Sequence, residues 1–345
     1  MVIGETDQLR SDESCSIPII DPVSIKRPMI PRQLVFEHHQ LDLLFNSIGL
    51  NRLISVLLNL SRSVADFGLL DDQSKFDRLD RSTSKLDRWI DEIPLDKDPQ
   101  RFGNKSFRIW GNRLETEAER LHNDLIDSYH LVIQPELLFY FRNSFGSFSR
   151  LDYGTGHELS FLAYLSILHL TRILKNEDLL SSVLVIYQRY LDICRKLQDY
   201  YRLEPAGSKG VYGLDDHFHL VYIFGSAQLL NVQTIIPSQI IDKKFLETPN
   251  LSQSSLFFGA INHINKLKRG PFFEHSPILY NVATTVKIWS KVHSGMIKMW
   301  KGEVLSKVQV MQHFWLVDGL DSGVLSRVHV KEVNERFDDD ISNDD

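Results

Sequence analysis

Apolar residues recur at steps of three and four along residues 178–203, and this spacing constrains the fold more than any other feature of the chain. Val183, Tyr187, Tyr190, Cys194 and Leu197 share one face of a helix with 3.6 residues per turn. Strict alternation of apolar and polar residues, the pattern of half-buried strands, is almost absent. The sequence therefore predicts an all-α fold of about ten helices.

The same helical spacing marks the remaining helices. The first is expected to begin near Pro31, because a proline in the first turn of a helix loses no hydrogen bond. The third is expected to end at Pro94. Further helices are expected at 112–130, 135–145, 215–230, 252–267 and 288–306. No repeat of roughly 30–45 residues is found, which argues against a solenoid.

The most apolar run of the chain extends from Leu159 to Leu174 and is interrupted by His169 and Arg172. It is shorter than the roughly 20 residues that a membrane-spanning helix needs. We therefore expect a buried helix here, and no membrane partner.

The net charge of −6 is concentrated at the two ends of the chain. Residues 332–345 carry seven carboxylates and one arginine, a net charge of −6. Residues 1–16 carry four carboxylates and one arginine, a net charge of −3, so residues 17–331 carry +3. A body so near neutrality lacks the basic face that nucleic-acid binding needs, and no nucleic-acid partner is expected.

Composition divides the chain into three expected regions. Residues 1–28 resemble a flexible leader, residues 29–331 form the helical domain, and residues 332–345 form a solvated, disordered acidic tail. The first residues contain no apolar segment, so no signal peptide is expected. The two cysteines, Cys15 and Cys194, exclude a disulfide framework and fit a reducing, intracellular compartment.

Residues 150–158 form the first of three glycine-containing polar segments. Gly154, Thr155 and Gly156 stand directly before the apolar run, and a helix that begins there points backbone N–H groups at an anion such as phosphate. Arg150 would add a bidentate contact. The alternative is that Thr155 caps the helix and the glycines only form the turn. No Gly-Lys-Ser/Thr follows, so this is not a Walker A loop.

Residues 204–219 form the second segment, in which Gly207, Gly210 and Gly213 permit close approach of the backbone to a ligand or another loop. Asp215 and Asp216 are able to supply the oxygen ligands that magnesium prefers. The alternative is that an aspartate caps the following helix. The chain contains no His-Glu-x-x-His pattern, so a zinc hydrolase is poorly supported.

Residues 270–277 and 289–300 form the third segment, which is dense in aromatic residues and methionine. Gly295 interrupts a helical pattern at a cost of about 1 kcal/mol relative to alanine, which suggests close packing against a neighbour. These residues either pack between helices or form a contact surface for a partner, where Trp, Met and other aromatic residues are enriched.

Covalent catalysis by a serine or cysteine nucleophile has no support in the sequence. The chain contains no Gly-x-Ser-x-Gly elbow, and neither cysteine stands in the context of a catalytic site. The residues alone predict an intracellular all-α protein with a pocket for phosphate and metal.

These segments resemble the phosphotyrosyl phosphatase activator family, the activators of serine/threonine protein phosphatase 2A, over roughly residues 30–316. The resemblance is carried by Leu86–Glu92, Arg101–Lys105, Asp152–Glu158, Glu204–Asp216, Phe224–Leu229, Gly270–Ser276 and Trp289–Phe314. It implies an all-helical fold with core, linker and lid parts around a deep cleft that binds ATP and magnesium. It also implies peptidyl-prolyl cis/trans isomerase activity on a proline-containing peptide, direct binding of the phosphatase catalytic subunit, and a location in the cytoplasm and nucleus.

The resemblance also assigns roles to individual residues. The phosphate contacts of ATP are expected from Arg150, Thr155 and Gly156, and the magnesium contacts from the carbonyl of Gly210 and the carboxylate of Asp216. The other wall of the nucleotide site is expected from Gln312, His313 and Phe314. The phosphatase-facing surface is expected to include Val286, Gly295 and Met299. Bulk or charge at Gly207 is expected to disturb the cleft.

A few positions depart from the family pattern. Tyr212 and Phe224 stand where the family has tryptophan. Lys287 and Ile288 precede Trp289 where a proline is common, and residues 308–309 replace a Phe-Pro pair. These departures concern the nucleotide wall more than the pocket itself.

Prolyl isomerisation needs no nucleophile, because its barrier of about 18–20 kcal/mol arises from amide resonance. A site lowers this barrier by binding the twisted amide better than the planar one. A groove lined by Tyr212, Phe218 and Trp289 is expected to hold the proline ring. The first hypothesis is a phosphatase activator with isomerase activity. The alternative is a non-catalytic assembly chaperone that uses ATP as a structural ligand, and an independent ATP-hydrolysing enzyme is less supported.

Overall fold

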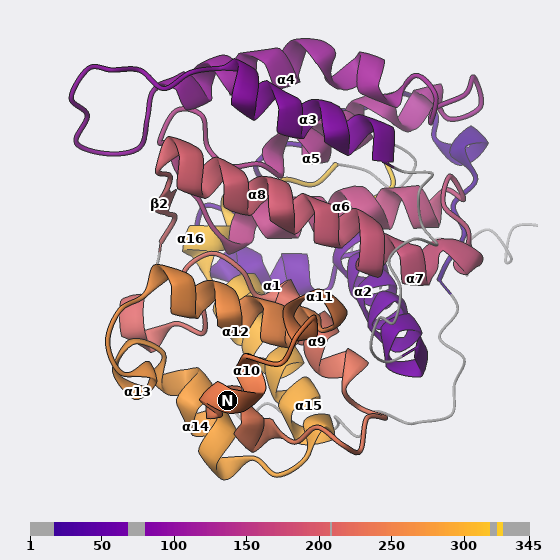
Figure 1. The fold of residues 1–345 in the computed structure, drawn as a ribbon. Helices are drawn as coiled ribbons and strands as arrows, with labels where there is room; N and C mark the ends of the chain where they lie inside the picture. Colours follow the sequence, from indigo (N-terminus) through magenta and orange to yellow (C-terminus); the bar gives the residue numbers. More distant parts are fainter. Residues whose placement is uncertain (1–16, 68–79, 208, 318–322, 327–345) are drawn as a thin grey trace, which may run out of the picture.

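The computed structural model describes residues 17–67, 80–207, 209–317 and 323–326. Helices make up most of this part of the chain (Figure 1). The strands assigned within it, β1 (Asp152–Tyr153) and β2 (Glu204–Pro205), are two residues long and pair in parallel. The prediction of an all-α fold is confirmed. The acidic tail expected at 332–345 lies outside the described residues, as does the first part of the expected leader, residues 1–16.

The first half of the chain forms a group of helices arranged in layers (Figure 1). Helices α3 and α4 cover one side of the group, and α6 lies beneath them in contact with α2 and α5. The helices of this group are α1 (His39–Phe45), α2 (Ile48–Phe67), α3 (Asp80–Glu92), α4 (Ser106–His122), α5 (Gln134–Asn143), α6 (Thr155–Leu170), α7 (Leu179–Ser181) and α8 (Gln188–Tyr201).

The second half of the chain forms a second group, which α9 joins to the first through its contacts with α2, α12 and α15. The helices of this group are α9 (Leu220–Gln228), α10 (Lys243–Leu246), α11 (Leu251–Ser254), α12 (Leu256–Leu267), α13 (Phe272–His275), α14 (Pro277–Thr285), α15 (Trp289–Trp300) and α16 (Val308–Met311).

Short irregular helices connect these elements. The 3-10 helices are η1 (Pro22–Ser24), η3 (Leu131–Ile133), η4 (Asn176–Asp178), η6 (Gly210–Tyr212) and η7 (Pro237–Ile241). Two π-helical stretches, η5 (Ser182–Tyr187) and η8 (Lys301–Leu305), continue directly into or out of α-helices. Such stretches are frequent at functional sites, and η8 contributes to the cavity described below.

Helix α6 is buried around its whole circumference from Glu158 to Leu170, as expected for the most apolar run of the chain. It ends four residues earlier than the run itself. The chain turns away here because Arg172 has a φ of 63°, which a right-handed helix cannot contain. None of the helices that the structure describes is long and apolar enough to cross a membrane.

The prediction of a helix over residues 178–203 is confirmed. The structure divides this helix into three consecutive helical elements. Helix α7, the π-helical stretch η5 and α8 follow one another without a break. The ring of Tyr190 in α8 stacks on Phe161 of α6, with ring centroids 3.7 Å apart, and Cys194 is fully buried beside it. Helix α8 ends at Arg202, which has a left-handed φ of 54°.

The prediction of a helix that begins near Pro31 is wrong for residues 31–38, because the first α-helix begins at His39. Arg32 instead forms an isolated antiparallel bridge with Leu316. The N–H of Arg32 donates to the carbonyl of Leu316 at 2.9 Å, and the N–H of Leu316 donates back at 3.2 Å. This long-range pairing uses the backbone groups that a helix would need.

The expected leader extends too far into the folded domain. Ile17, Ile20 and Ile25 are buried, and the N–H of Ile20 donates to the carbonyl of Leu170 at the end of α6 at 2.8 Å. Residues 17–25 therefore contribute side chains to the core, and residue 28 does not separate a flexible segment from a folded one.

Three other predicted helix boundaries are wrong for local reasons. Helix α4 ends at His122, whose carbonyl accepts from the N–H groups of both Leu125 and Ile126 and so closes a turn. Helix α9 begins only at Leu220, because residues 215–219 form a turn. The helix expected at 252–267 is divided into α11 and α12 at Ser255, which has an extended backbone.

Candidate functional site: a cavity between two groups of helices

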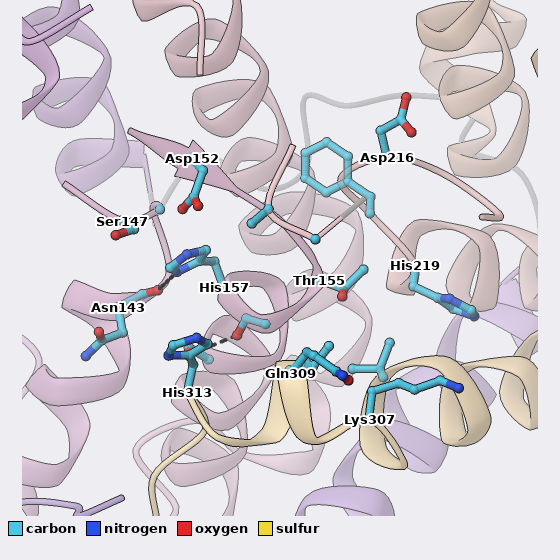
Figure 2. Close-up of a pocket in the computed structure, with 18 of the residues that line it drawn as sticks. Asn143, Ser147, Asp152, Thr155, His157, Asp216, His219, Lys307, Gln309 and His313 are labelled. Carbon is cyan, nitrogen blue, oxygen red and sulfur yellow. Dashed lines mark hydrogen bonds between the residues drawn. The ribbon is translucent and has the colours of Figure 1, made fainter. Parts of the chain in front are cut away.

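A cavity of about 1030 Å³ lies between the two groups of helices (Figure 2). Its main walls come from residues 142–160, which include β1 and the start of α6, from the loop 206–219 after β2, and from residues 299–315 around η8 and α16. The first two walls are the glycine-containing segments that the sequence singled out. The volume is at the upper end of the roughly 300–1,000 Å³ that is typical of small-molecule sites.

The N-terminal end of α6 opens onto this cavity. Thr155 is the first residue of the helix and lies near the middle of the cavity in Figure 2, with Gly156 beside it in the lining. No side chain of the described residues caps this helix end. The interpretation of Thr155 as a cap is therefore wrong, and the N–H groups of the first turn offer the positive end of the helix dipole to an anion.

Gly154 has a steric role just before this helix. A Cβ on Gly154 would lie 2.7 Å from the carbonyl oxygen of Ala206. The N–H of Ala206 donates to the carbonyl of Tyr153 at 2.8 Å, so the two glycine-containing loops are held against each other. Only glycine permits this approach, which brings the two predicted segments to one cavity.

Basic side chains line the cavity, and carboxylates accompany them. Arg150 Nε donates to the Asp152 carboxylate at 2.8 Å. Lys209 pairs with Glu303, and Lys307 Nζ lies 3.9 Å from the same carboxylate. The pairing of Arg150 engages only Nε of its planar fork, so its two Nη atoms retain donors suited to a phosphate.

The candidate magnesium residues are only partly brought together. Asp216 lines the cavity, with its carboxylate 2.7 Å from Lys268 Nζ. Gly210 is not among the lining residues, and its carbonyl accepts from the N–H of Gly213 at 3.1 Å. Within the described ranges, no group of three or more His, Cys, Asp or Glu residues could hold a metal ion. This donor set still fits magnesium, which often binds through one carboxylate, waters and the phosphates of a nucleotide.

Asp215 also lines the cavity and has a structural role in the loop. Its Oδ1 accepts from the N–H groups of His217 at 2.8 Å and Phe218 at 3.1 Å, and its Oδ2 accepts from the Tyr222 hydroxyl at 2.6 Å. It therefore stabilises the turn before α9 instead of capping that helix, which begins later, at Leu220.

Of the predicted nucleotide wall at Gln312, His313 and Phe314, only His313 lines the cavity, and its contact with a nucleotide stays a prediction. Phe314 is buried and stacks on Tyr140, with ring centroids 5.7 Å apart. Gln312 Nε2 donates to the carbonyl of Gln309 at 3.3 Å and also lies outside the lining. The other lining residues between 299 and 315 are Met299, Glu303, Val304, Lys307, Gln309, Val310 and Trp315.

The predicted aromatic groove is not assembled as expected. Tyr212 and Phe218 both line the cavity; the Tyr212 residue is 83% exposed, and Phe218 is buried in the wall. Trp289 instead packs against Phe257, with ring centroids 5.1 Å apart, and its Nε1 donates to the carbonyl of Ile235 at 2.8 Å. The assignment of Trp289 to this groove is therefore wrong, because its buried N–H finds its partner in the core of the second group of helices.

Gly207 lies in the cavity lining with a φ of 67°, and a Cβ placed on it would meet no atom within 4 Å. A side chain here would be strained in the backbone and would project into open space. This agrees with the expectation that bulk or charge at Gly207 would disturb the cleft, whose effect on function stays a prediction.

The three residues expected on a partner surface differ in position. Met299 lines the cavity, Val286 is half-buried at the end of α14, and Gly295 is exposed on α15. A Cβ on Gly295 would meet no atom within 4 Å, so the prediction of close packing within the chain is wrong. An exposed glycine without a neighbour leaves the contact-surface interpretation open.

Sequence reasoning missed the network formed by Glu158 and His219 at the back of the cavity. The Glu158 carboxylate accepts from the N–H groups of His219 at 2.7 Å and Leu220 at 3.1 Å, and from the Tyr187 hydroxyl at 2.6 Å. His219 Nε2 in turn donates to the carbonyl of Met296 in α15 at 2.9 Å. Burial raises the pKa of Glu158 to about 7 and lowers the pKa of His219 to about 4. The available signal was a carboxylate at the head of a long apolar run.

The fold and the cavity define an all-α protein with a large cavity at the N-terminal end of a buried helix. The family model described as "Phosphotyrosyl phosphate activator (PTPA) protein" matches residues 31–321. The chain belongs to this family, which confirms the resemblance found in the sequence.

Curated relatives and a solved structure agree with this assignment. The serine/threonine-protein phosphatase 2A activator 1 of Schizosaccharomyces pombe is 41% identical over 291 residues, which are 82% of this chain and 88% of that protein. The protein of the same name from Debaryomyces hansenii is 45% identical over 259 residues, or 72% of this chain and 58% of that protein. The crystal structure of the PP2A phosphatase activator Ypa1 has a TM-score of 0.83 and 34% identity, and the match covers 91% of this chain and 100% of that one.

Proposed function

We propose that this chain activates serine/threonine protein phosphatase 2A, as the names of its relatives state for them, by binding the catalytic subunit together with ATP and magnesium. The observation that carries the proposal is the position of α15. Met299 of this helix lines the cavity, while Gly295, one turn earlier, is exposed. Because residues four apart share one face of a helix, a ligand in the cavity and a partner at Gly295 would contact neighbouring turns of the same face of α15.

The donors of the cavity support a polyphosphate ligand. Arg150 and the backbone N–H groups of Thr155 and Gly156 would bind the phosphates, and His313 would contact the nucleoside from the opposite wall. The Asp216 carboxylate would hold magnesium, with the carbonyl of Gly210 as the second ligand that the family resemblance implies. Bound magnesium would supply counter-charge to the phosphates.

Isomerase activity is the further part of the proposal, and Tyr212 and Phe218 support it. Both line the cavity, and a proline ring packed between an exposed and a buried aromatic side chain would lose its water. The barrier to rotation about the amide bond falls when the site binds the twisted form of the amide better than the planar form. This step needs no nucleophile. Gly207 lies on the same loop and leaves room for the peptide.

The test of activation combines a binding measurement and an activity measurement. The purified chain would be incubated with the purified phosphatase 2A catalytic subunit, with and without ATP and magnesium, and then co-precipitated and assayed for phosphatase activity. We expect both binding and activity to increase with ATP and magnesium, and Arg150→Ala to weaken the increase. Arg120→Ala is the control, because its side chain is 75% exposed on α4, outside the cavity lining. A chain that neither bound the subunit nor raised its activity would refute the proposal.

A non-catalytic assembly chaperone with ATP as a structural ligand is the second candidate function. The position of Trp289 favours it, because the cavity holds only two of the three aromatic residues expected for a proline groove. Isomerisation of a proline-containing peptide separates the two functions. An isomerase would turn over the peptide above the uncatalysed rate and lose this activity in Gly207→Asp. Background rates for both proteins, with phosphatase binding retained, would support the chaperone.

A further inference from the structure

The lysine and arginine side chains that line the cavity are all paired with carboxylates of the same lining. The pairs are Arg142 with Glu115, Arg150 with Asp152, and both Lys209 and Lys307 with Glu303. An anion that enters the cavity therefore meets cations whose charge is already compensated. Its affinity depends on what it takes from these carboxylates.

Glu303 differs from the other two carboxylates because it serves two cations from two walls. Its Oε2 pairs with Lys209 of the loop 206–219, and its Oε1 lies 3.9 Å from Lys307 Nζ, at the start of α16. Glu303 itself belongs to the π-helical stretch η8. One negative charge thus stands between two positive charges, at the point where the loop meets η8 and α16.

All three side chains of this cluster are accessible to a ligand. They line the cavity, and their side chains are 38–45% exposed. Ion pairs between side chains this exposed contribute little to stability, because water screens them. A phosphate group offers a lysine more negative charge and more acceptor oxygens than a carboxylate does. The pairing with Glu303 is therefore one that a polyphosphate is able to replace.

The cluster lies next to the end of α6 that is proposed to bind phosphate. Helix α16 contacts α6, and a Cβ on Gly156 would lie 3.5 Å from Cγ1 of Val310. Lys307 stands three residues before Val310, and Figure 2 shows it in the same part of the cavity as Thr155. Phosphates bound at the first turn of α6 would have the two lysines as their neighbours.

We propose that Glu303 competes with the phosphates of the ligand for Lys209 and Lys307, and that a polyphosphate displaces it from both lysines. This inference rests on the proposed function, because it concerns the polyphosphate proposed there. Glu303 is then a specificity-determining residue, since only a ligand with enough negative charge to displace it gains the two lysines. It also holds the affinity for polyphosphate below the value that the basic residues alone would give.

Isothermal titration calorimetry on the full chain tests the proposal with three ligands. These are ATP, tripolyphosphate, which lacks the nucleoside, and adenosine, which lacks the phosphates. A chelator is present, so that magnesium contributes nothing to the difference between variants. We expect Glu303→Gln to bind ATP and tripolyphosphate about fivefold more tightly than the wild type and adenosine equally well. In about 1 M salt, the gain should fall to within about twofold, because the charges are then screened.

A second pair of variants separates competition from simple repulsion. If Glu303 acts through the lysines, Glu303→Gln should change tripolyphosphate affinity by less than about twofold in a chain that already carries Lys209→Gln and Lys307→Gln. Glu92→Gln is the matched control, because Glu92 is also paired, with Arg113, and its side chain is 43% exposed, but it lies outside the cavity lining. It should bind all three ligands as the wild type does.

Each failure has its own pattern. If Glu303→Gln bound tripolyphosphate no more tightly than the wild type, or more weakly, Glu303 would not be a competitor. If the gain persisted in full without the two lysines, Glu303 would only repel the ligand, and the proposed exchange would be wrong. If neither the wild type nor Glu303→Gln bound ATP or tripolyphosphate, with the chelator or with magnesium, the proposed function itself would be overturned, and this inference with it.

Discussion

Glu158 of α6 accepts a hydrogen bond from the backbone N–H of His219 at 2.7 Å, across 61 residues of sequence. The same carboxylate accepts from the N–H of Leu220, so a side chain of α6 caps α9, which has no side-chain cap of its own at His219. His219 continues the connection to Met296 of α15. One buried carboxylate thereby fixes the helix that opens onto the cavity relative to the helix that carries the proposed partner surface.

Replacement of Glu158 by glutamine is expected to destabilise the fold. Glutamine offers one acceptor oxygen to three donors and turns its own amide N–H towards them, which leaves buried donors unsatisfied. The free energy of unfolding is expected to fall by about 1–3 kcal/mol. Urea denaturation measures this change. Glu177→Gln is the control, because the Glu177 side chain is 77% exposed, and its effect should stay within about 0.5 kcal/mol. Equal stability of the two variants would contradict the capping role.

Glu136 gives the stability of the chain a specific dependence on pH. It is buried and accepts from the N–H groups of Val324 and Leu325, each at 2.7 Å. Burial raises its pKa from the ordinary value of 4.5 to about 7. The folded state therefore binds this proton more tightly than the unfolded state does. The contribution of Glu136 to stability is fully present below pH 4.5 and is lost as the pH rises through 7.

The comparison with Glu136→Gln isolates this contribution, because the opposite effect of the buried histidines is common to both proteins. The free energy of unfolding of the wild type minus that of the variant is expected to decrease between pH 4.5 and 7 by up to about 3 kcal/mol. Denaturation at several pH values measures it. The exposed Glu119 provides the control variant Glu119→Gln, for which the difference should not depend on pH. A difference that increased with pH for Glu136→Gln would contradict the raised pKa.

Gly295→Ala is expected to raise stability and lower phosphatase binding at the same time. The new methyl group meets no atom within 4 Å in the chain, and alanine is the better helix former by about 1 kcal/mol. A partner packed on this part of α15 would have to move to accommodate it. Thermal or chemical denaturation measures the first effect, and co-precipitation with the phosphatase catalytic subunit measures the second.

Asn112→Ala separates these two effects. Asn112 is exposed on α4, away from α15, so the substitution also raises helix propensity but should leave phosphatase binding unchanged. If Gly295→Ala were stabilised and bound the phosphatase as well as the wild type, α15 would not be the contact surface at this position.

The sequence predicted the helices whose apolar faces are set by local spacing. Helices α6 and α8 follow their patterns closely, because steps of three and four place Tyr190 and Cys194 on one buried face whatever the rest of the chain does. The segment before His39 also has helical spacing, yet its backbone pairs with Leu316. A partner so distant in sequence has no local signal.

In the candidate site too, features set by the local sequence were predicted, and features set by distant partners were not. Arg150, Thr155 and Asp216 were predicted from glycine-containing loops, and the structure brings them to one cavity because these loops pack against each other. The predictions that Trp289 and Phe314 line the cavity were wrong. In a segment dense in apolar residues, the sequence does not indicate whether an aromatic side chain faces the cavity or the core. The carbonyl that binds Trp289 belongs to Ile235, 54 residues earlier.

Removal of residues 332–345 is expected to leave ATP and phosphatase binding unchanged. The seven carboxylates of this stretch lie outside residues 31–321, which the family model matches. Calorimetry with ATP and co-precipitation with the catalytic subunit, each on the full and the shortened chain, check this. A loss of either interaction would show that the tail takes part in the mechanism.

Asp216→Asn is expected to remove the magnesium dependence of ATP binding while leaving the cavity intact. The Asp216 carboxylate lies 2.7 Å from Lys268 Nζ, so it is a partly buried charge that already attracts a cation, and magnesium would take over this role when the nucleotide enters. Without magnesium, the variant should bind ATP at least as tightly as the wild type, because one negative charge near the phosphates is gone. With magnesium, only the wild type should gain affinity, by about tenfold.

Calorimetry in the presence of a chelator and then of magnesium measures both states, and Asp98→Asn, in an exposed loop, should behave as the wild type. If Asp216→Asn kept the full gain with magnesium, the ion would be held by other residues, and the assignment of Asp216 would be wrong.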